Sequence, residues 1–179
     1  MGKSHLWYTF GGTYVNAVIT GDIDDDGVLE IITGGQHSDS TSSTNAQLRI
    51  WSWDGDNLSL EASREWGTGS IFSYSSINTI AIGDVDNDGS AEIVTGGYAG
   101  AFLSSSGQFR VWSWDSTTML LEGSETWSNA SIIRGLAIND VEWDSVPEIV
   151  TGGYHSTWFS PPKSERESGA SSKLEARLP

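Results

Sequence analysis

The sequence predicts an all-β fold built from β-propeller blades, each a sheet of four short antiparallel strands. An acidic phrase that begins at Asp22 recurs at Asp84 and, less regularly, at Asp140, which sets a repeat of roughly 60 residues. The segments around these phrases alternate apolar and polar residues and are rich in β-branched and aromatic side chains, as strands are. The 21 Gly and 9 Trp among 179 residues suit a turn-rich β protein with a bulky core. We expect no helix.

Alignment of the repeats gives the strands of each blade in order. The first strands precede the acidic phrase and span 16–20, 78–82 and 134–138. The second strands follow it, end in a Gly-Gly pair, and span 30–33, 92–95 and 148–151. The third strands span 47–53 and 108–114, and the fourth span 59–66 and 120–127. We expect the Gly pairs to make tight turns or close blade packing, and the tryptophans of the third strands to pack between blades.

These strands divide the chain into two full blades and part of a third. The predicted segments are a lead-in that ends a preceding blade (1–15), blade 1 (16–77), blade 2 (78–133), a partial blade 3 (134–160), and a tail that is disordered or vector-derived (161–179). Propellers close with roughly four to eight blades. We therefore expect an incomplete ring, so that the chain is either part of a larger propeller or completes a ring as a homo-oligomer.

Charge and composition exclude several classes of function. The net charge of −15 argues against nucleic acid as a partner, because phosphate binding needs clustered Lys and Arg. The absence of Cys excludes disulfides and thiol chemistry. No apolar stretch is long enough to insert into a membrane, and any export signal would lie outside this sequence.

The acidic phrases place oxygen ligands at alternate positions before a glycine, which is how a short loop wraps a hard cation such as Ca²⁺. The first loop offers Asp22, Asp24, Asp26, the carbonyl of Val28, and Glu30. The second offers Asp84, Asp86, Asp88, the carbonyl of Ser90, and Glu92. The alternative is an acidic hairpin turn without metal, but its carboxylates would repel one another. Mg²⁺ fits less well because it demands strict octahedral geometry.

The third loop departs from the motif. Its candidate ligands are Asp140, Glu142, Asp144 and Glu148. Ser145 replaces the glycine and Pro147 stiffens the turn, so we expect weaker binding there. None of the loops is an EF-hand, because the twelfth position lacks the bidentate Glu and strands flank the loops.

The phrase Asp-x-Asp-x-Asp-Gly-x-x-Glu-Ile, followed by a strand with Gly-Gly, resembles the FG-GAP/VCBS repeats of integrin-α-like propellers, over about residues 7 to 158. The family usually carries Asp where this chain has Glu30 and Glu92. The resemblance implies a calcium-stabilised, extracellular or cell-surface module for recognition or adhesion. The alternatives are a fragment of a secreted propeller enzyme that acts on polysaccharide, or a purely structural module.

No arrangement of residues indicates catalysis, so we expect a binding module and not an enzyme. Strand direction places the loops after Gly-Gly and the loops between blades on the face opposite the acidic loops. Aromatic and imidazole side chains among small polar residues suit a surface that recognises protein or glycan. The candidate ligand-binding residues are Phe72, Tyr74, Tyr98, Phe102 and His37.

Overall fold

The computed structural model describes residues 12–38, 43–70, 72–101, 104–127, 131–155 and 174–176, and in this part of the chain every regular element is a strand. The strands of the first sheet are β1 (Thr13–Gly21), β2 (Glu30–His37), β3 (Asn45–Trp53) and β4 (Leu58–Trp66). Those of the second are β5 (Ser73–Gly83), β6 (Glu92–Ala101), β7 (Ser104–Trp114) and β8 (Met119–Trp127). The third holds β9 (Ser131–Asn139), β10 (Glu148–His155) and β11 (Leu174–Ala176). The predicted all-β class is confirmed.

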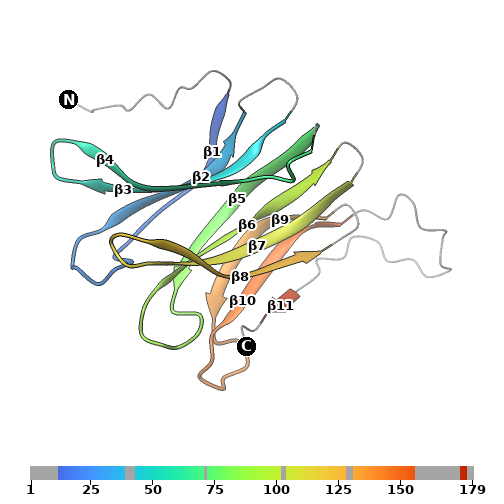
Figure 1. Cartoon of the computed structure of the whole chain (residues 1–179). Helices are drawn as coiled ribbons and strands as arrows, with labels where there is room; N and C mark the ends of the chain where they lie inside the picture. Colours follow the sequence, from blue (N-terminus) through green and yellow to red (C-terminus); the bar gives the residue numbers. More distant parts are fainter. Residues whose placement is uncertain are drawn as a thin grey trace.

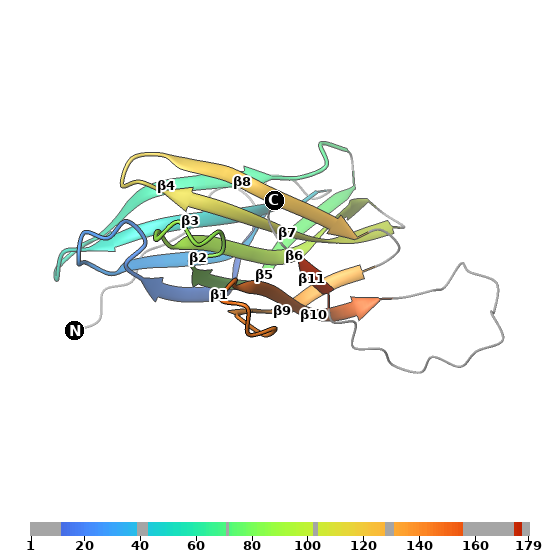
Figure 2. The same cartoon turned by 90° about the horizontal axis from the view of Figure 1, so that it is seen from below.

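We call these sheets 1, 2 and 3. Sheets 1 and 2 are four-stranded meanders in the orders β1-β2-β3-β4 and β5-β6-β7-β8, and sheet 3 has the order β11-β10-β9. All pairings between these strands are antiparallel. The first strands, β1, β5 and β9, lie one beside the next along one side of the molecule, and each sheet packs on the next (Figures 1 and 2). Each predicted strand lies within, or overlaps, an observed one.

The Gly-Gly pairs do not end the second strands, contrary to the prediction, because β2, β6 and β10 continue beyond them. The second glycine of each pair lies against the first strand where that strand's register shifts. A Cβ at Gly35 would lie only 1.8 Å from the carbonyl oxygen of Tyr14, and one at Gly97 only 1.9 Å from that of Ser76. These positions therefore accept no side chain, and the strand continues because glycine lets the two backbones approach.

Two apolar layers hold the sheets together. The layer between sheets 1 and 2 includes Ile32, Leu48 and Ile50 from one side and Ile77, Ile93, Trp112, Trp114 and Met119 from the other. The layer between sheets 2 and 3 includes Val94, Phe109 and Val111 with Ile133 and Ile149. Removal of this apolar surface from water is the main force that stacks the sheets. Of the third-strand tryptophans, Trp51, Trp112 and Trp114 are buried as predicted, whereas Trp53 is 42 % exposed.

Residues 174–176 lie in the segment predicted to be a tail without regular structure, but they form β11. This short strand pairs with Ile149, Val150 and Thr151 on the outer edge of β10, the edge at which the other sheets hold their third strands. The remaining residues of the predicted tail lie outside the described residues. In the part of the chain that the structure describes, no helix is long and apolar enough to cross a membrane.

Candidate metal centres

An acidic loop joins the first and second strands of every sheet, and the three loops have the same backbone shape. The fourth residue of each loop has a positive φ: Asp25 (58°), Asn87 (65°) and Trp143 (61°). The sixth residue does too: Gly27 (84°), Gly89 (99°) and Ser145 (68°). The third loop thus keeps the turn although a serine replaces the glycine, and Ser145 is held in a conformation that disfavours a side chain.

Hydrogen bonds from backbone amides to the loop aspartates account for this shape. The first aspartate accepts the amide of the sixth residue through Oδ2: Asp22 from Gly27 (3.0 Å), Asp84 from Gly89 (3.0 Å) and Asp140 from Ser145 (2.8 Å). The fifth residue accepts the amide of the seventh through Oδ1: Asp26 from Val28 (2.7 Å), Asp88 from Ser90 (2.7 Å) and Asp144 from Val146 (3.0 Å). Such local bonds are typical of Asp in turns.

The glutamate at the start of each second strand is hydrogen-bonded to the beginning of the loop that precedes it. Its Oε2 accepts the amide of the second loop residue: Glu30 from Ile23 (3.1 Å), Glu92 from Val85 (2.8 Å) and Glu148 from Val141 (2.8 Å). All three glutamates are buried, with at most 3 % of their surface exposed. This bond explains why the chain carries Glu and not Asp here, because the longer side chain reaches across the hairpin.

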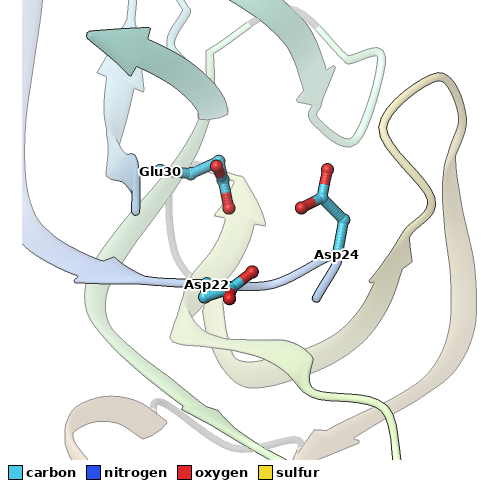
Figure 3. Close-up of side chains that lie close together, drawn as sticks. All are labelled: Asp22, Asp24 and Glu30. Atoms are coloured by element: carbon cyan, nitrogen blue, oxygen red, sulfur yellow. The ribbon is translucent and has the colours of Figure 1, made fainter. Parts of the chain in front are cut away.

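The three loops gather carboxylates into three clusters. The clusters are Asp22, Asp24 and Glu30; Asp84, Asp86 and Glu92; and Asp140, Asp144 and Glu148. Within each, one oxygen from every residue lies within 4.8 Å of the others. In the first, the side chains of Asp22, Asp24 and Glu30 point toward a common space (Figure 3). Each cluster could hold a metal ion.

The first cluster has buried oxygens that are suited to bind a cation. Oδ1 of Asp22 and Oδ1 of Asp24 are buried, and neither has a hydrogen-bond partner among the described residues. Buried carboxylate oxygens in protein interiors are almost always paired, because an unpaired one has lost water and gained nothing. Two such oxygens that converge with a glutamate supply the hard donor atoms that Ca²⁺ and Mg²⁺ take.

Two of the buried glutamates have raised pKa values, because burial and nearby carboxylates disfavour their charged form. Burial raises the pKa of Glu92 to about 7, against the opposing bond from the Val85 amide, and the nearby charge of Asp86 adds to the rise. Burial likewise raises the pKa of Glu30, with Asp24 contributing in the same direction. A cation at the cluster would oppose both effects, since it favours the charged carboxylate.

Some predicted ligands lie outside the clusters. The clusters do not include Asp26, Asp88 or Glu142. In the first two loops the middle member of the cluster is the third loop residue, whereas in the third loop it is the fifth, Asp144. The carbonyls of Val28 and Ser90 remain predicted ligands.

One contact to the first cluster comes from a different sheet and could not be predicted from the sequence. The hydroxyl of Ser116, in the turn between β7 and β8 of sheet 2, donates to Oδ2 of Asp24 over 2.6 Å. The two residues are 92 positions apart, so only the stacking of the sheets brings them together. The first loop is therefore tied to the neighbouring sheet as well as to its own.

The predicted recognition residues lie at the strand ends far from the acidic loops. Phe72 (51 % exposed, φ 62°) and Tyr74 (40 %) lie where β5 begins, and burial raises the pKa of the Tyr98 hydroxyl on β6. His37, at the end of β2, is 3.2 Å from Glu65 through Nδ1 and Oε2. Thr44, just before β3, forms an isolated β-bridge with Tyr74 of β5, which links sheets 1 and 2 at this end. Phe102 lies outside the described residues.

No protein-family model matches this chain, and no curated protein matches it at a significant level.

Proposed function

We propose that the chain is a calcium-stabilised module of β-propeller blades, of the FG-GAP/VCBS type, that serves extracellular or cell-surface recognition and is not an enzyme. The observation that carries the proposal is the buried, unpaired pair of oxygens on Asp22 and Asp24 beside Glu30. The same loop geometry recurs at the same corner of the other sheets, so the arrangement is a repeated feature and not an isolated acidic turn.

Calcium is the cation that this donor set favours. The clusters offer only oxygen donors, and these are held on short loops. Such loops suit Ca²⁺ because it accepts a variable number of oxygen ligands in flexible geometry. Thiolate is absent from the sequence, and the described clusters contain no imidazole, so ions that prefer sulfur or nitrogen gain nothing here. Mg²⁺ is the weaker candidate because it gives up its waters reluctantly.

The role we assign to the ion is structural. Each loop joins the first two strands of a sheet, so an ion bound to residues on both sides of the loop fixes that hairpin. The Ser116 contact extends the effect of the first site to the packing of sheet 2 on sheet 1. The ion thereby stabilises the sheets that present the opposite end of the molecule.

That opposite end is the proposed ligand-binding surface. Phe72 and Tyr74 are exposed there, and aromatic side chains supply contact area at low entropic cost in recognition of protein and glycan. A calcium-stabilised scaffold with aromatic residues on its loops suits adhesion or recognition at a cell surface.

Thermal melts with calcium and with chelator test the metal assignment. A ligand that binds only the folded state adds about 2.7 kcal/mol per site at a hundredfold excess over Kd. We expect a clear rise in Tm with Ca²⁺, a smaller rise with Mg²⁺, and loss of most of the shift when Asp24 and Asp86 are both changed to Ala. Superimposable curves for the wild type with calcium and with chelator would rule out the proposal.

A further inference from the structure

The two junctions between sheets are built in the same way. A Cβ at Gly34 on β2 would lie 2.7 Å from the Ile77 side chain and 2.8 Å from that of Ile80. Two branched apolar side chains on β5 therefore sit directly on a glycine of the preceding sheet. The second junction has the same arrangement. A Cβ at Gly96 on β6 would lie 2.8 Å from the Ile133 side chain and 2.7 Å from the Leu136 side chain, both on β9. We call the glycine the hole and the paired side chains the knob.

A side-chain amide crosses each junction beside the knob. Nδ2 of Asn16 on β1 donates to the carbonyl oxygen of Ile77 over 2.9 Å. Nδ2 of Asn78 on β5 donates to the carbonyl oxygen of Ile133 over 2.8 Å. The junction thus has a fixed register along the strands as well as an apolar contact.

Sheet 3 presents a hole that no described residue fills. Gly152 on β10 corresponds to Gly34 and Gly96 and pairs in register with Gly135 on β9. A Cβ at either position would meet no described atom within 4 Å. Gly152 is exposed, whereas its two counterparts are buried.

Sheet 1 presents a knob that no described residue covers. Val15 pairs with Gly35 and Val18 with Thr33, the same register that Ile77 and Ile80 have on Gly97 and Thr95. Val15 is 48 % exposed and Val18 is 66 % exposed, whereas Ile77 is 1 % exposed.

Larger side chains show the same asymmetry at both ends. Trp114 is 6 % exposed in the junction between sheets 1 and 2, and its counterpart Trp53 on the open face of sheet 1 is 42 % exposed. Val85 is 5 % exposed in the junction between sheets 2 and 3, and its counterpart Val141 on sheet 3 is 37 % exposed. Both end faces therefore expose apolar residues whose counterparts are buried in an internal junction, although Trp51, the counterpart of Trp112, is buried on sheet 1 (1 % exposed).

We propose that the knob face of sheet 1 (Val15, Val18 and Trp53) binds the hole face of sheet 3 (Gly135, Gly152 and Val141) of a second copy of this chain. The contact continues the two internal junctions, in which the same positions already meet with the same register. Knob and hole lie on different surfaces, so the interface is head to tail and generates a ring if the rotation closes, or a filament if it does not. The proposal rests on sheet packing and does not require the metal.

Two complementary variants test this arrangement. Val18→Asp breaks the knob and keeps the hole, while Gly152→Leu fills the hole and keeps the knob; both positions are exposed, so the fold should survive, as circular dichroism can verify. Multi-angle light scattering over a concentration series should give an oligomer for the wild type and the mass of one chain for each variant. An equimolar mixture of the two variants should give twice that mass. The intact hole of the Val18→Asp variant can bind the intact knob of the Gly152→Leu variant, and no other pairing of intact faces remains.

Leu120→Asp serves as the matched control, because Leu120 is 56 % exposed but lies on sheet 2, between the two ends; it should leave the oligomer unchanged. A wild type that stays monomeric over the series would overturn the proposal and assign the open faces to another partner, such as further sheets of a longer chain. Oligomers that persist in both variants, or a mixture that stays monomeric, would overturn it as well.

Discussion

The first two acidic loops and the third differ at two defining positions and still have the same backbone. Ser145 stands where the others have glycine, and Glu142 where they have aspartate, yet the third loop keeps both positive φ angles and its buried glutamate bond to a backbone amide. Hydrogen bonds from amides to carboxylates therefore hold the loop shape. The glycine lowers the strain of that shape, and the third and fifth residues decide which carboxylates face the cluster.

The largest effect that this comparison predicts is on the buried glutamates. Glu92→Ala would leave the Val85 amide without its acceptor and should lower the free energy of unfolding in chelator by about 1–3 kcal/mol. Glu148→Ala should cost a similar amount, because the bond is the same in the third loop. Urea denaturation measures both. The exposed Glu61→Ala is the control. A negligible loss for Glu148→Ala would mean that the third loop is held differently.

The pH dependence of the metal-free protein should show the cost of burying Glu92. Its pKa is about 7 in the folded protein, above the ordinary 4.5, so the folded state binds the proton more tightly than the unfolded state does. This contribution is fully present below pH 4.5 and is lost as the pH rises through about 7. Urea denaturation in chelator at several pH values should record the decline.

Two further measurements sharpen that test. Glu92→Gln, which cannot ionise, should flatten most of the decline between pH 4.5 and 7. Calcium should reverse its sign, because a bound cation favours the charged carboxylate and therefore gains affinity as the pH rises. Stability that is flat with pH in the metal-free wild type would contradict the burial of an ionisable Glu92.

The smallest predicted effect concerns the strain at Ser145. Its φ of 68° suits glycine, so Ser145→Gly should raise the free energy of unfolding by about 0.5–1 kcal/mol. Gly27→Ala and Gly89→Ala, at φ 84° and 99°, should lower it by about as much. Chemical denaturation resolves changes of this size. A destabilised Ser145→Gly variant would show that the serine side chain has a role beyond the turn.

The repeat made much of this fold predictable from the sequence. Period-2 patterns located ten strands, and the alternate carboxylates located the loops, because both features are local. The continuation of β2 past Gly34 and Gly35 was not predictable, since glycine also marks strand ends and the close approach of Tyr14 becomes visible only in the paired sheet.

The candidate site was likewise predictable in part. Asp22, Asp24 and Glu30 were identified by spacing alone and do converge. The exclusion of Asp26 from the cluster and the bond from Ser116 to Asp24 were not predictable. The first depends on which way a side chain turns within a tight loop, and the second on how one sheet stacks on another.

The most direct test of the calcium assignment is an isothermal titration of the metal-free protein that counts its sites. We predict two sites of higher affinity, one of which disappears in Asp24→Asn and the other in Asp86→Asn. The third loop should bind more weakly, and Glu142→Gln should leave it unchanged because Glu142 lies outside its cluster. Absence of binding heat under conditions where the protein is folded, or a stoichiometry unaffected by Asp24→Asn and Asp86→Asn, would rule out calcium binding at these loops.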